Sequence, residues 1–330
     1  MLAQPATQRS AGAQLRPVRM RCPACKHALR ALPLSDPDER AACTACQFVI
    51  ASQGGIWRAL PPLRDLFYRR FATEYSLVRE REGRGSPTAE YYLELPYHDL
   101  NGRNTRQWQI RARSFDYLRS RVLPAIEGRF GRHLRVLDLG AGNGWLSYRL
   151  AQRGYDCAAV DVLDDPLAGL GAGKHYAGRF LRPFVCVQAE MDNLPFVDGQ
   201  FDLAIFNGSF HYSEDYTRTL RETLRCLRAG AEVVIVDTPY YQREESGRAM
   251  VQEQFENFRE KYGFRPDSLR SREYLTPERL QELAAACGLR WQIGRPWYGV
   301  SWALRPWQAK LQGRPAPAEA YVLSATAGGR

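Results

Sequence analysis

Lysine is scarce in this chain, and long apolar runs are missing from it. Lys26, Lys174, Lys261 and Lys310 are the lysines among 46 basic residues, which outnumber 36 acidic residues and give a net charge of +10. The arginines are scattered along the chain instead of forming one basic run, so the positive charge is weak support for a nucleic-acid partner. No apolar stretch approaches the roughly 20 residues that span a bilayer, so the sequence predicts no membrane-spanning helix and no membrane partner.

The first twenty residues also lack an apolar core of about 7–15 residues, which a secretory signal needs. We therefore expect residues 1–18 to form a disordered lead-in and the protein to be cytoplasmic. With 330 residues, 45% of them hydrophobic, the chain is long enough for one large globular domain or two, with a full core.

Cysteines are concentrated near the N-terminus. Cys22 and Cys25 form one Cys-x-x-Cys pair, Cys43 and Cys46 form a second, and seventeen residues separate the pairs. This spacing is typical of a four-cysteine zinc site, and the turn-rich segment between the pairs has too few apolar residues to fold without a metal. Disulfides are the alternative, but a reducing cytoplasm disfavours them. We predict a zinc ribbon over residues 19–56, in which His27 is a solvated neighbour and not a ligand.

A glycine-rich loop follows an apolar run in the middle of the chain. Residues 134–139 read as a buried strand, and Gly140, Gly142 and Gly144 come next. Residues 144–152 then repeat apolar side chains at helical spacing, and residues 155–162 form a second strand pattern ending near Asp161. Strand, glycine loop, helix and strand are the first unit of a doubly wound sheet, whose ligands bind at the carboxyl ends of the strands.

The residues around the loop distinguish between two nucleotide cofactors. A dinucleotide fingerprint needs a third glycine at position 145, where Trp145 stands, and its pyrophosphate would be repelled by Asp138. S-adenosylmethionine carries a cationic sulfonium and ammonium and no phosphate, so Asp138 suits it, and Asp161 can accept from both ribose hydroxyls. The segment resembles the D-x-G-x-G-x-G motif of class I S-adenosylmethionine-dependent methyltransferases.

Downstream residues extend the resemblance to the ubiquinone-methyltransferase-like branch of that family. Leu194-Pro195-Phe196 resembles the branch's third motif, and the resemblance implies that Glu190 meets the adenine amino group and that the Met191 amide faces the adenine ring. Asp192 competes with Glu190 for the first role. Asn207, which ends the fourth strand, is expected beside the methionine moiety and the incoming substrate.

The expected architecture is α/β: a doubly wound, Rossmann-like, seven-stranded methyltransferase sheet with a small N-terminal zinc ribbon and a helical cap. The cap consists of residues 57–130. It contains one helix over residues 65–82 and a second over residues 104–123, which ends before Pro124. The methyltransferase domain covers residues 131–330 and contains an inserted substrate lid at residues 239–275. A tryptophan-rich loop, WYGVSWALRPW, precedes the last strand and is either core packing or crevice wall.

The acceptor side is less well defined by the sequence. His211 is the leading candidate for a general base, although a structural histidine bonded to backbone is as good a reading. Arg111 is a candidate for the cofactor carboxylate and Trp108 for the crevice wall. The full set of candidates is Asp138, Gly140, Gly142, Gly144, Asp161, Val162, Glu190, Met191, Asn207 and Arg111 for the cofactor, Tyr212, Tyr240, Tyr241 and Trp108 for the substrate, and Cys22, Cys25, Cys43 and Cys46 for zinc.

These expectations point to methyl transfer from S-adenosylmethionine to a small organic molecule. Two other functions stay open: an RNA base methyltransferase that docks through the ribbon, and a non-catalytic cofactor-binding subunit. "NGSF" at Asn207 replaces the Asn-Pro-Pro-Tyr motif that is used on exocyclic nitrogens of nucleobases, which favours the small molecule. The accepting atom and the oligomeric state are not indicated by any motif.

Overall fold

The computed structural model describes residues 17–29, 39–177 and 184–328. The lead-in expected at residues 1–18 lies outside the described residues except for its last two. Of these, Pro17 accepts a hydrogen bond from Arg135 (2.9 Å) through its carbonyl oxygen, and Val18 is buried in the hydrophobic core. The chain is therefore held against the domain from residue 17 onward.

One mixed sheet runs through the described part of the chain, in the strand order β1-β2-β3-β6-β5-β4-β7-β8-β10-β9. From β6 to β9 these are the seven strands that the sequence predicts: β6, β5, β4, β7 and β8 are parallel, and β10 is antiparallel to β8 and β9. The doubly wound α/β fold is confirmed. The strands are β4 (Arg135–Leu139), β5 (Asp156–Asp161), β6 (Val185–Gln188), β7 (Phe201–Asn207), β8 (Leu227–Tyr240), β9 (Gln292–Gly294) and β10 (Glu319–Thr326).

The N-terminal segment continues this sheet instead of standing apart from it. β1 (Arg40–Ala42) pairs with β2 (Val49–Gln53), β2 pairs with β3 (Ile56–Arg58), and β3 lies parallel to β6. Trp57 is paired with Val187, and both side chains are buried. The described residues thus form a ten-stranded sheet where the sequence predicted seven, because three short strands after the lead-in add an edge to it.

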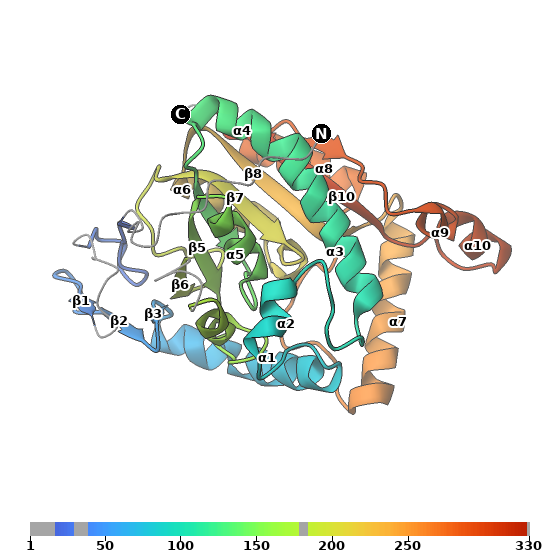
Figure 1. Cartoon of the computed structure of the whole chain (residues 1–330), viewed down its shortest axis with the longest axis horizontal. Coiled ribbons are helices and arrows are strands. Elements are labelled where there is room, and N and C mark those ends of the chain that lie inside the picture. The colour runs from blue at the N-terminus through green and yellow to red at the C-terminus, as the bar shows by residue number, and fades with distance from the viewer. Residues whose placement is uncertain (1–16, 30–38, 178–183, 329–330) are drawn as a thin grey trace.

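Helices cover both faces of the sheet (Figure 1). On one face α6 and α8 bury Leu220 and Leu280 in a cluster that also contains Ile50 of β2. On the other face α3 and α5 bury Phe115 and Leu146. The helices on these faces are α2 (Ala89–Glu94), α3 (Thr105–Tyr117), α4 (Leu123–Phe130), α5 (Trp145–Gln152), α6 (Tyr216–Cys226) and α8 (Pro277–Cys287), with 3-10 turns at Leu170–Tyr176 and Phe210–Tyr212.

The helical cap is confirmed in kind but differs in one boundary. α1 (Pro62–Arg81) matches the helix expected over residues 65–82. The second expected helix does not end before Pro124: a π-helical turn, Leu118–Val122, leads directly into α4, which has Pro124 in its first turn. Proline is tolerated there because the first N–H groups of a helix have no partner within the helix.

The C-terminal part contains the insertion expected at residues 239–275. Its centre is α7 (Glu244–Tyr262), which stands along one side of the molecule near the end of α1 (Figure 1). The tryptophan-rich loop forms two short helices, α9 (Val300–Ala303) and α10 (Arg305–Leu311), which project from the body at the end opposite the N-terminal strands. Every helix in the described part of the chain is too short or too polar to cross a bilayer.

Candidate functional site

The glycine loop lies between β4 and α5, at the carboxyl edge of the sheet. Gly140, Gly142 and Gly144 have φ angles of 69°, 53° and 77°, a left-handed backbone that side-chain-bearing residues rarely adopt. A Cβ at Gly140 would lie 2.3 Å from the Cβ of Ser209, so the chain also needs glycine there for space. The loop therefore keeps its backbone exposed to the cavity beside it, where a ligand can approach closely.

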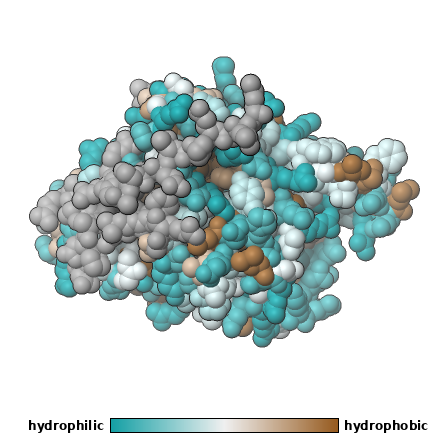
Figure 2. Space-filling model, in the orientation of Figure 1, coloured by the Kyte–Doolittle hydropathy of each residue, from teal (hydrophilic) through white to brown (hydrophobic). Residues whose placement is uncertain are grey.

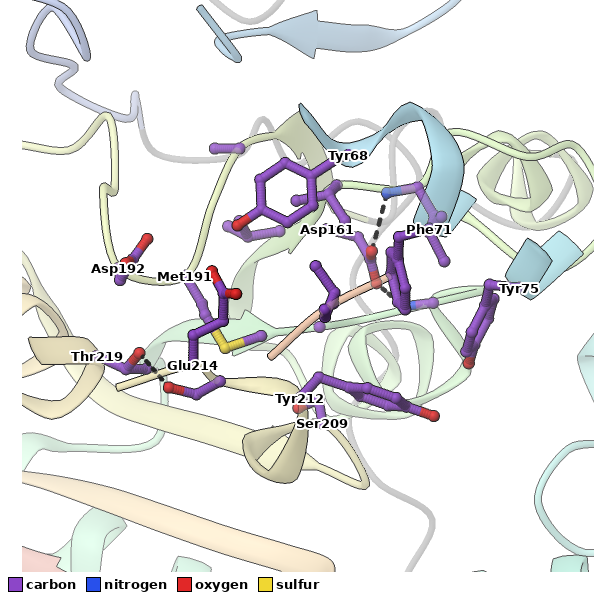
Figure 3. A pocket seen from close by; sticks show the side chains of 18 of the residues that line it. Tyr68, Phe71, Tyr75, Asp161, Met191, Asp192, Ser209, Tyr212, Glu214 and Thr219 are labelled. Carbon is purple, nitrogen blue, oxygen red and sulfur yellow. Dashed lines mark hydrogen bonds between the residues drawn. The ribbon is translucent and has the colours of Figure 1, made fainter. Parts of the chain in front are cut away.

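Asp161 ends β5 beside this loop. Its carboxylate accepts hydrogen bonds from the backbone N–H of Gly142 (2.8 Å) and of Leu163 (2.9 Å), as Figure 3 shows. Burial raises the pKa of Asp161, and these two backbone N–H groups act against that rise. The side chain lines a cavity together with Gly140, Gly142, Val162 and Met191. We call this the Asp161 cavity.

Asp138 lies on the neighbouring strand, β4, and is 1% exposed. Ser147 donates a hydrogen bond to its Oδ2 (2.7 Å), whereas its Oδ1 is buried without a hydrogen-bond partner among the described residues. Burial raises the pKa of this carboxyl to about 7. The group lines a second cavity, the Asp138 cavity, in which an ammonium group would meet a carboxylate that lacks a partner.

The two acidic candidates for an adenine contact occupy different places. Glu190 is 2% exposed and is not among the residues that line the Asp161 cavity; its carboxylate accepts from Arg64 of α1 at 2.7–2.8 Å and from Tyr68 at 3.4 Å. Asp192 lines the Asp161 cavity beside Met191, and its Oδ1 is buried without a partner in the described chain. The structure therefore brings Asp192, and not Glu190, to the cavity wall.

One wall of the Asp161 cavity comes from α1. Tyr68, Phe71 and Tyr75 point into it from successive turns, and Figure 3 shows them around Asp161. Sequence reasoning placed α1 in the cap but named none of these residues. Their spacing of three and four residues along an amphipathic helix was the available signal, but the same spacing is also typical of ordinary core packing.

Three cavities meet at the carboxyl edge of the sheet. The third, the His211 cavity, has a volume of about 420 Å³, against about 80 Å³ for the Asp161 cavity and about 70 Å³ for the Asp138 cavity. Tyr75 and Gly208 line all three, and Asn207, the last residue of β7, lines the Asp138 cavity. The cavities are thus branches of one crevice that join beside Gly208.

The His211 cavity is lined by basic as well as aromatic groups. Burial, together with the nearby positive charges of Arg79 and Arg111, lowers the pKa of the His211 imidazole to about 3, so this histidine is neutral. Its Nδ1 is buried and has no hydrogen-bond partner in the described part of the chain. Arg111 also lines the Asp138 cavity and lies 4.8 Å from the ring centroid of Trp108, which lines that cavity as well.

Asp237 is a lining residue that sequence reasoning missed. It stands near the carboxyl end of β8 with a φ of 54°, which is unusual for a residue other than glycine and occurs often at functional sites. Its Oδ1 accepts from Ser114 (2.6 Å), and its Oδ2 is buried without a partner among the described groups. Burial raises the pKa of this carboxyl. No motif marks the position, because its role depends on the backbone conformation.

Three further sequence candidates lie outside the crevice. Tyr240 and Tyr241, expected to line the acceptor pocket, are each 3% exposed and pack against the rings of Tyr321 (5.0 Å) and Tyr274 (5.5 Å). The physical reason is that β8 continues to Tyr240 and pairs there with β10. Gly144 serves packing: a Cβ at this position would lie 2.8 Å from the ring of Phe184. Tyr212, by contrast, lines both the Asp161 and the His211 cavities.

The four N-terminal cysteines converge. All four Sγ atoms lie within 4.8 Å of one another, with Cys22 at 3.5 Å from Cys46 and Cys25 at 3.5 Å from Cys43. Each Cys-x-x-Cys pair lies in the same kind of turn. The backbone N–H of Lys26 donates to the carbonyl oxygen of Cys22, and the backbone N–H of Gln47 donates to the carbonyl oxygen of Cys43. Lys26 and Gln47 share a left-handed backbone, with φ of 69° and 61°.

This cysteine cluster is fixed to the loop that follows Asp192. Met20 forms a β-bridge with Phe196, and the N–H of Arg21 donates to the carbonyl of Pro195 (3.0 Å). Arg21 also forms an ion pair with Glu222 (3.0 Å), whose carboxylate accepts from the N–H of Leu194 (2.8 Å). The loop that ends the Asp161 cavity is therefore held from outside by the cysteine-bearing segment.

Comparison with known proteins gives a consistent result. Residues 137–235 match the model of a family described as a methyltransferase domain. A malonyl-[acyl-carrier protein] O-methyltransferase from Geobacter sulfurreducens is 36% identical over 93 residues, which cover 28% of this chain and 34% of the relative. A ubiquinone/menaquinone biosynthesis C-methyltransferase from Methylobacterium nodulans is 26% identical over 159 residues, 44% of this chain and 63% of that one. The chain thus spans about a third of the first relative's length and under two thirds of the second's.

A solved structure agrees in fold. A protein from Galdieria sulphuraria that carries the name of a sarcosine dimethylglycine methyltransferase superposes with a TM-score of 0.50 at 16% identity, over 78% of this chain and 98% of the other. At this identity the likeness concerns the fold alone. Residues 137–235 thus match a methyltransferase domain, and the chain shares the fold of this solved structure.

Proposed function

We propose that this protein is an enzyme that transfers a methyl group from S-adenosylmethionine to a small organic molecule held under α1 and α7. The observation that carries the proposal is the junction at Gly208, where the cavities beside Asp161, Asp138 and His211 meet. Such a junction gives one branch to a nucleoside, one to an amino-acid moiety and one to an acceptor. The names of the two relatives above likewise refer to acceptors other than nucleic acid.

The residues present suit the cofactor. In the Asp161 cavity the carboxylate of Asp161 would accept from the ribose hydroxyls, and the unpartnered Oδ1 of Asp192 would accept from the adenine amino group. In the Asp138 cavity the unpartnered carboxylate would hold the ammonium, and Arg111 would hold the carboxylate of the same moiety. Asn207 lies beside that moiety at the end of β7.

When bound, the cofactor supplies an electrophilic methyl group on a cationic sulfur. The chain's own contribution is position: the accepting atom must lie in line with the methyl carbon and the sulfur, and holding it there lowers the barrier substantially. Tyr75 and Tyr212 stand at the junction and enclose it. Phe258 of α7 and Phe71 of α1 line the acceptor side and keep water from it.

A proton must leave the acceptor only if the accepting atom carries one. His211 and Asp237 both face the acceptor cavity and can take that proton. A protonated His211 would face Arg79 and Arg111, which opposes its use as a base. Asp237 carries an unpartnered oxygen and a raised pKa, which suit the task. We assign His211 an orienting hydrogen bond to the acceptor and Asp237 the proton.

We further propose one structural zinc ion per chain, held by Cys22, Cys25, Cys43 and Cys46. Tetrahedral coordination with bonds of about 2.3 Å places sulfur atoms about 3.8 Å apart, close to the spacing of this cluster. Elemental analysis of protein purified without a chelator should find zinc at one equivalent. A metal-free protein whose N-terminal segment is as resistant to proteolysis as the rest of the chain would overturn the assignment.

The methyl-transfer proposal is tested by labelling. The purified protein is incubated with S-adenosylmethionine carrying a labelled methyl group and, separately, with the low-molecular-weight fraction and the RNA fraction of the same cell extract. We expect label in the low-molecular-weight fraction and none with an Asp161→Ala variant. Label in RNA would replace the small-molecule acceptor with the RNA alternative. Cofactor binding without turnover in any fraction would favour the non-catalytic subunit.

A further inference from the structure

A row of apolar side chains is exposed on the projecting C-terminal arm, which we define as residues 295–316 and which contains α9 and α10. Val300, Leu304, Trp307 and Leu311 follow one another along these helices at intervals of four, three and four positions, so their side chains lie on one face. Their side chains are largely in solvent: Val300 is 65% exposed, Leu304 47%, Trp307 73% and Leu311 84%, and Trp297, just before α9, is 65% exposed. We call these five residues the stripe.

The opposite face of the arm is turned toward the rest of the protein. The stripe is therefore not the face through which the arm packs on the protein's own core. Arg305 stacks on Trp302 and donates to the carbonyl of Ala318 (2.7 Å). Ala309 lines a groove whose far wall is α7. Figure 2 shows the apolar side chains gathered at the outer end of this arm, where the described chain has no other element to cover them.

The charge around the stripe is of one sign. Between Glu282 and Glu319 the chain has no acidic residue, and its charged residues there are Arg290, Arg295, Arg305, Lys310 and Arg314. Apart from Arg305, which is turned inward, these side chains are exposed. Tryptophan and leucine on one face of a short helix, with lysine and arginine beside them, are the composition of helices that lie in the interface of a bilayer.

We propose that the arm binds the surface of an anionic lipid bilayer, with the stripe at the depth of the headgroups and the basic residues on the lipid phosphates. A second copy of the chain fits less well, because pairing two arms would bring like charges together. The expectation that the protein has no membrane partner was based on the missing spanning segment, which a helix lying on the surface does not need.

The proposal is tested by co-sedimentation of the full chain with vesicles of phosphatidylcholine mixed with phosphatidylglycerol and, separately, of phosphatidylcholine alone. Wild type should bind the mixed vesicles, and binding should fall steeply with salt. A Trp307→Ser/Leu311→Ser variant should lose about 100-fold in partitioning, because two large apolar side chains no longer enter the interface. Lys310→Glu/Arg314→Glu should lower binding to the mixed vesicles by about tenfold or more.

The matched control is a Leu63→Ser/Leu100→Ser variant, which removes two exposed leucines (81% and 56% exposed) far from the arm and should bind like wild type. Thermal midpoints show that every variant is folded. Wild-type protein that sediments with neither kind of vesicle would overturn the proposal. So would equal binding to neutral and anionic vesicles, or self-association in lipid-free buffer that the Trp307→Ser/Leu311→Ser variant abolishes, since the stripe would then be a protein interface.

Discussion

Asp161 is the last residue of β5 and Asp138 the last but one of the neighbouring β4, but their hydrogen-bond partners differ. Asp161 is held by two backbone N–H groups and faces the cavity in which we propose the nucleoside, whereas Asp138 keeps one oxygen without a partner in the described structure. The first group is built to remain ionised and oriented. The second pays a burial cost in the ligand-free protein that a cationic ligand would offset.

Replacing Asp161 by alanine should weaken binding of S-adenosylhomocysteine by about 10- to 100-fold, because two ribose hydroxyls lose a charged acceptor. Titration calorimetry measures the effect. Asp164→Ala is the matched control: Asp164 is three residues further on, half exposed and paired with Arg58, and its loss should leave the affinity unchanged. Equal affinities for Asp161→Ala and wild type would remove Asp161 from the site.

Asp138 should make cofactor affinity depend on pH. Its pKa of about 7 means that the carboxyl is protonated below neutrality, and the protonated form does not attract an ammonium group. Between about pH 8 and about pH 6 the dissociation constant of S-adenosylhomocysteine should rise by up to about tenfold in wild type and stay nearly flat in Asp138→Asn.

Thermal unfolding of the same two proteins provides a check of sign. The folded pKa of Asp138 lies above its ordinary value of 3.8, so ionisation costs stability, and that cost grows as the pH rises from 3.8 through about 7. Ligand-free Asp138→Asn should therefore gain in thermal midpoint over wild type at alkaline pH and show no such gain in acid. A gain confined to acid would contradict the burial argument.

The two groups in the acceptor cavity can be separated by kinetics with the acceptor that the labelling experiment identifies. Asp237→Asn should lower kcat by about 100-fold or more and remove an ionisation from the pH profile, provided that the accepting atom loses a proton. His211→Gln should mainly raise KM, since only an orienting hydrogen bond is lost. The reverse pattern would make His211 the base, as the sequence first suggested.

At this scale, a residue's place in the site could be predicted from the sequence where a short local motif fixes it, and not where a contact distant in the sequence does. The glycine loop and the acidic strand end form a short motif with one geometry, so their places in the fold could be predicted. Which of Glu190 and Asp192 lines the cavity could not, because Glu190 is paired with Arg64, which lies 126 residues before it. Tyr240 and Tyr241 were misplaced because nothing local shows where β8 ends.

At the scale of elements, the cysteine-bearing segment and the cofactor crevice are mechanically joined. The β-bridge between Met20 and Phe196 and the bond from Arg21 to Pro195 tie the cysteine turns to the loop after Asp192. The cysteine spacing predicted the cluster, but the strands around it were too short to reveal that they extend the sheet. A segment expected to be a zinc ribbon of its own thereby also supports the loop beside the Asp161 cavity.

Removing the zinc ion that we propose should therefore weaken cofactor binding as well as stability. Cys43→Ser, or treatment with a strong chelator, should lower the thermal midpoint and weaken S-adenosylhomocysteine binding by about 3- to 10-fold, because the loop after Asp192 loses its outer support. Cys287→Ser is the control, since Cys287 lies outside the cluster and is partly exposed. Full affinity in chelator-treated protein would show that the loop after Asp192 keeps its conformation without the metal.

At the scale of the whole molecule, the crevice, the cysteine cluster and the C-terminal arm lie at different places around the sheet. Its carboxyl edge, covered by α1 and α7, carries the crevice, while the cysteine cluster and the C-terminal arm stand at opposite ends (Figure 1). That the central strands are parallel followed from the alternation of strand and helix patterns, whereas their order did not. The helical cap was also predicted, but not which side chains of α1 line the crevice.

The most direct test of the account is a crystal structure with S-adenosylhomocysteine bound. We expect the ribose hydroxyls on Asp161, the ammonium on Asp138 and the sulfur at the junction beside Gly208, pointing into the cavity of His211 and Asp237. A ligand whose sulfur points away from that cavity, or whose ribose leaves Asp161 without a contact, would contradict it.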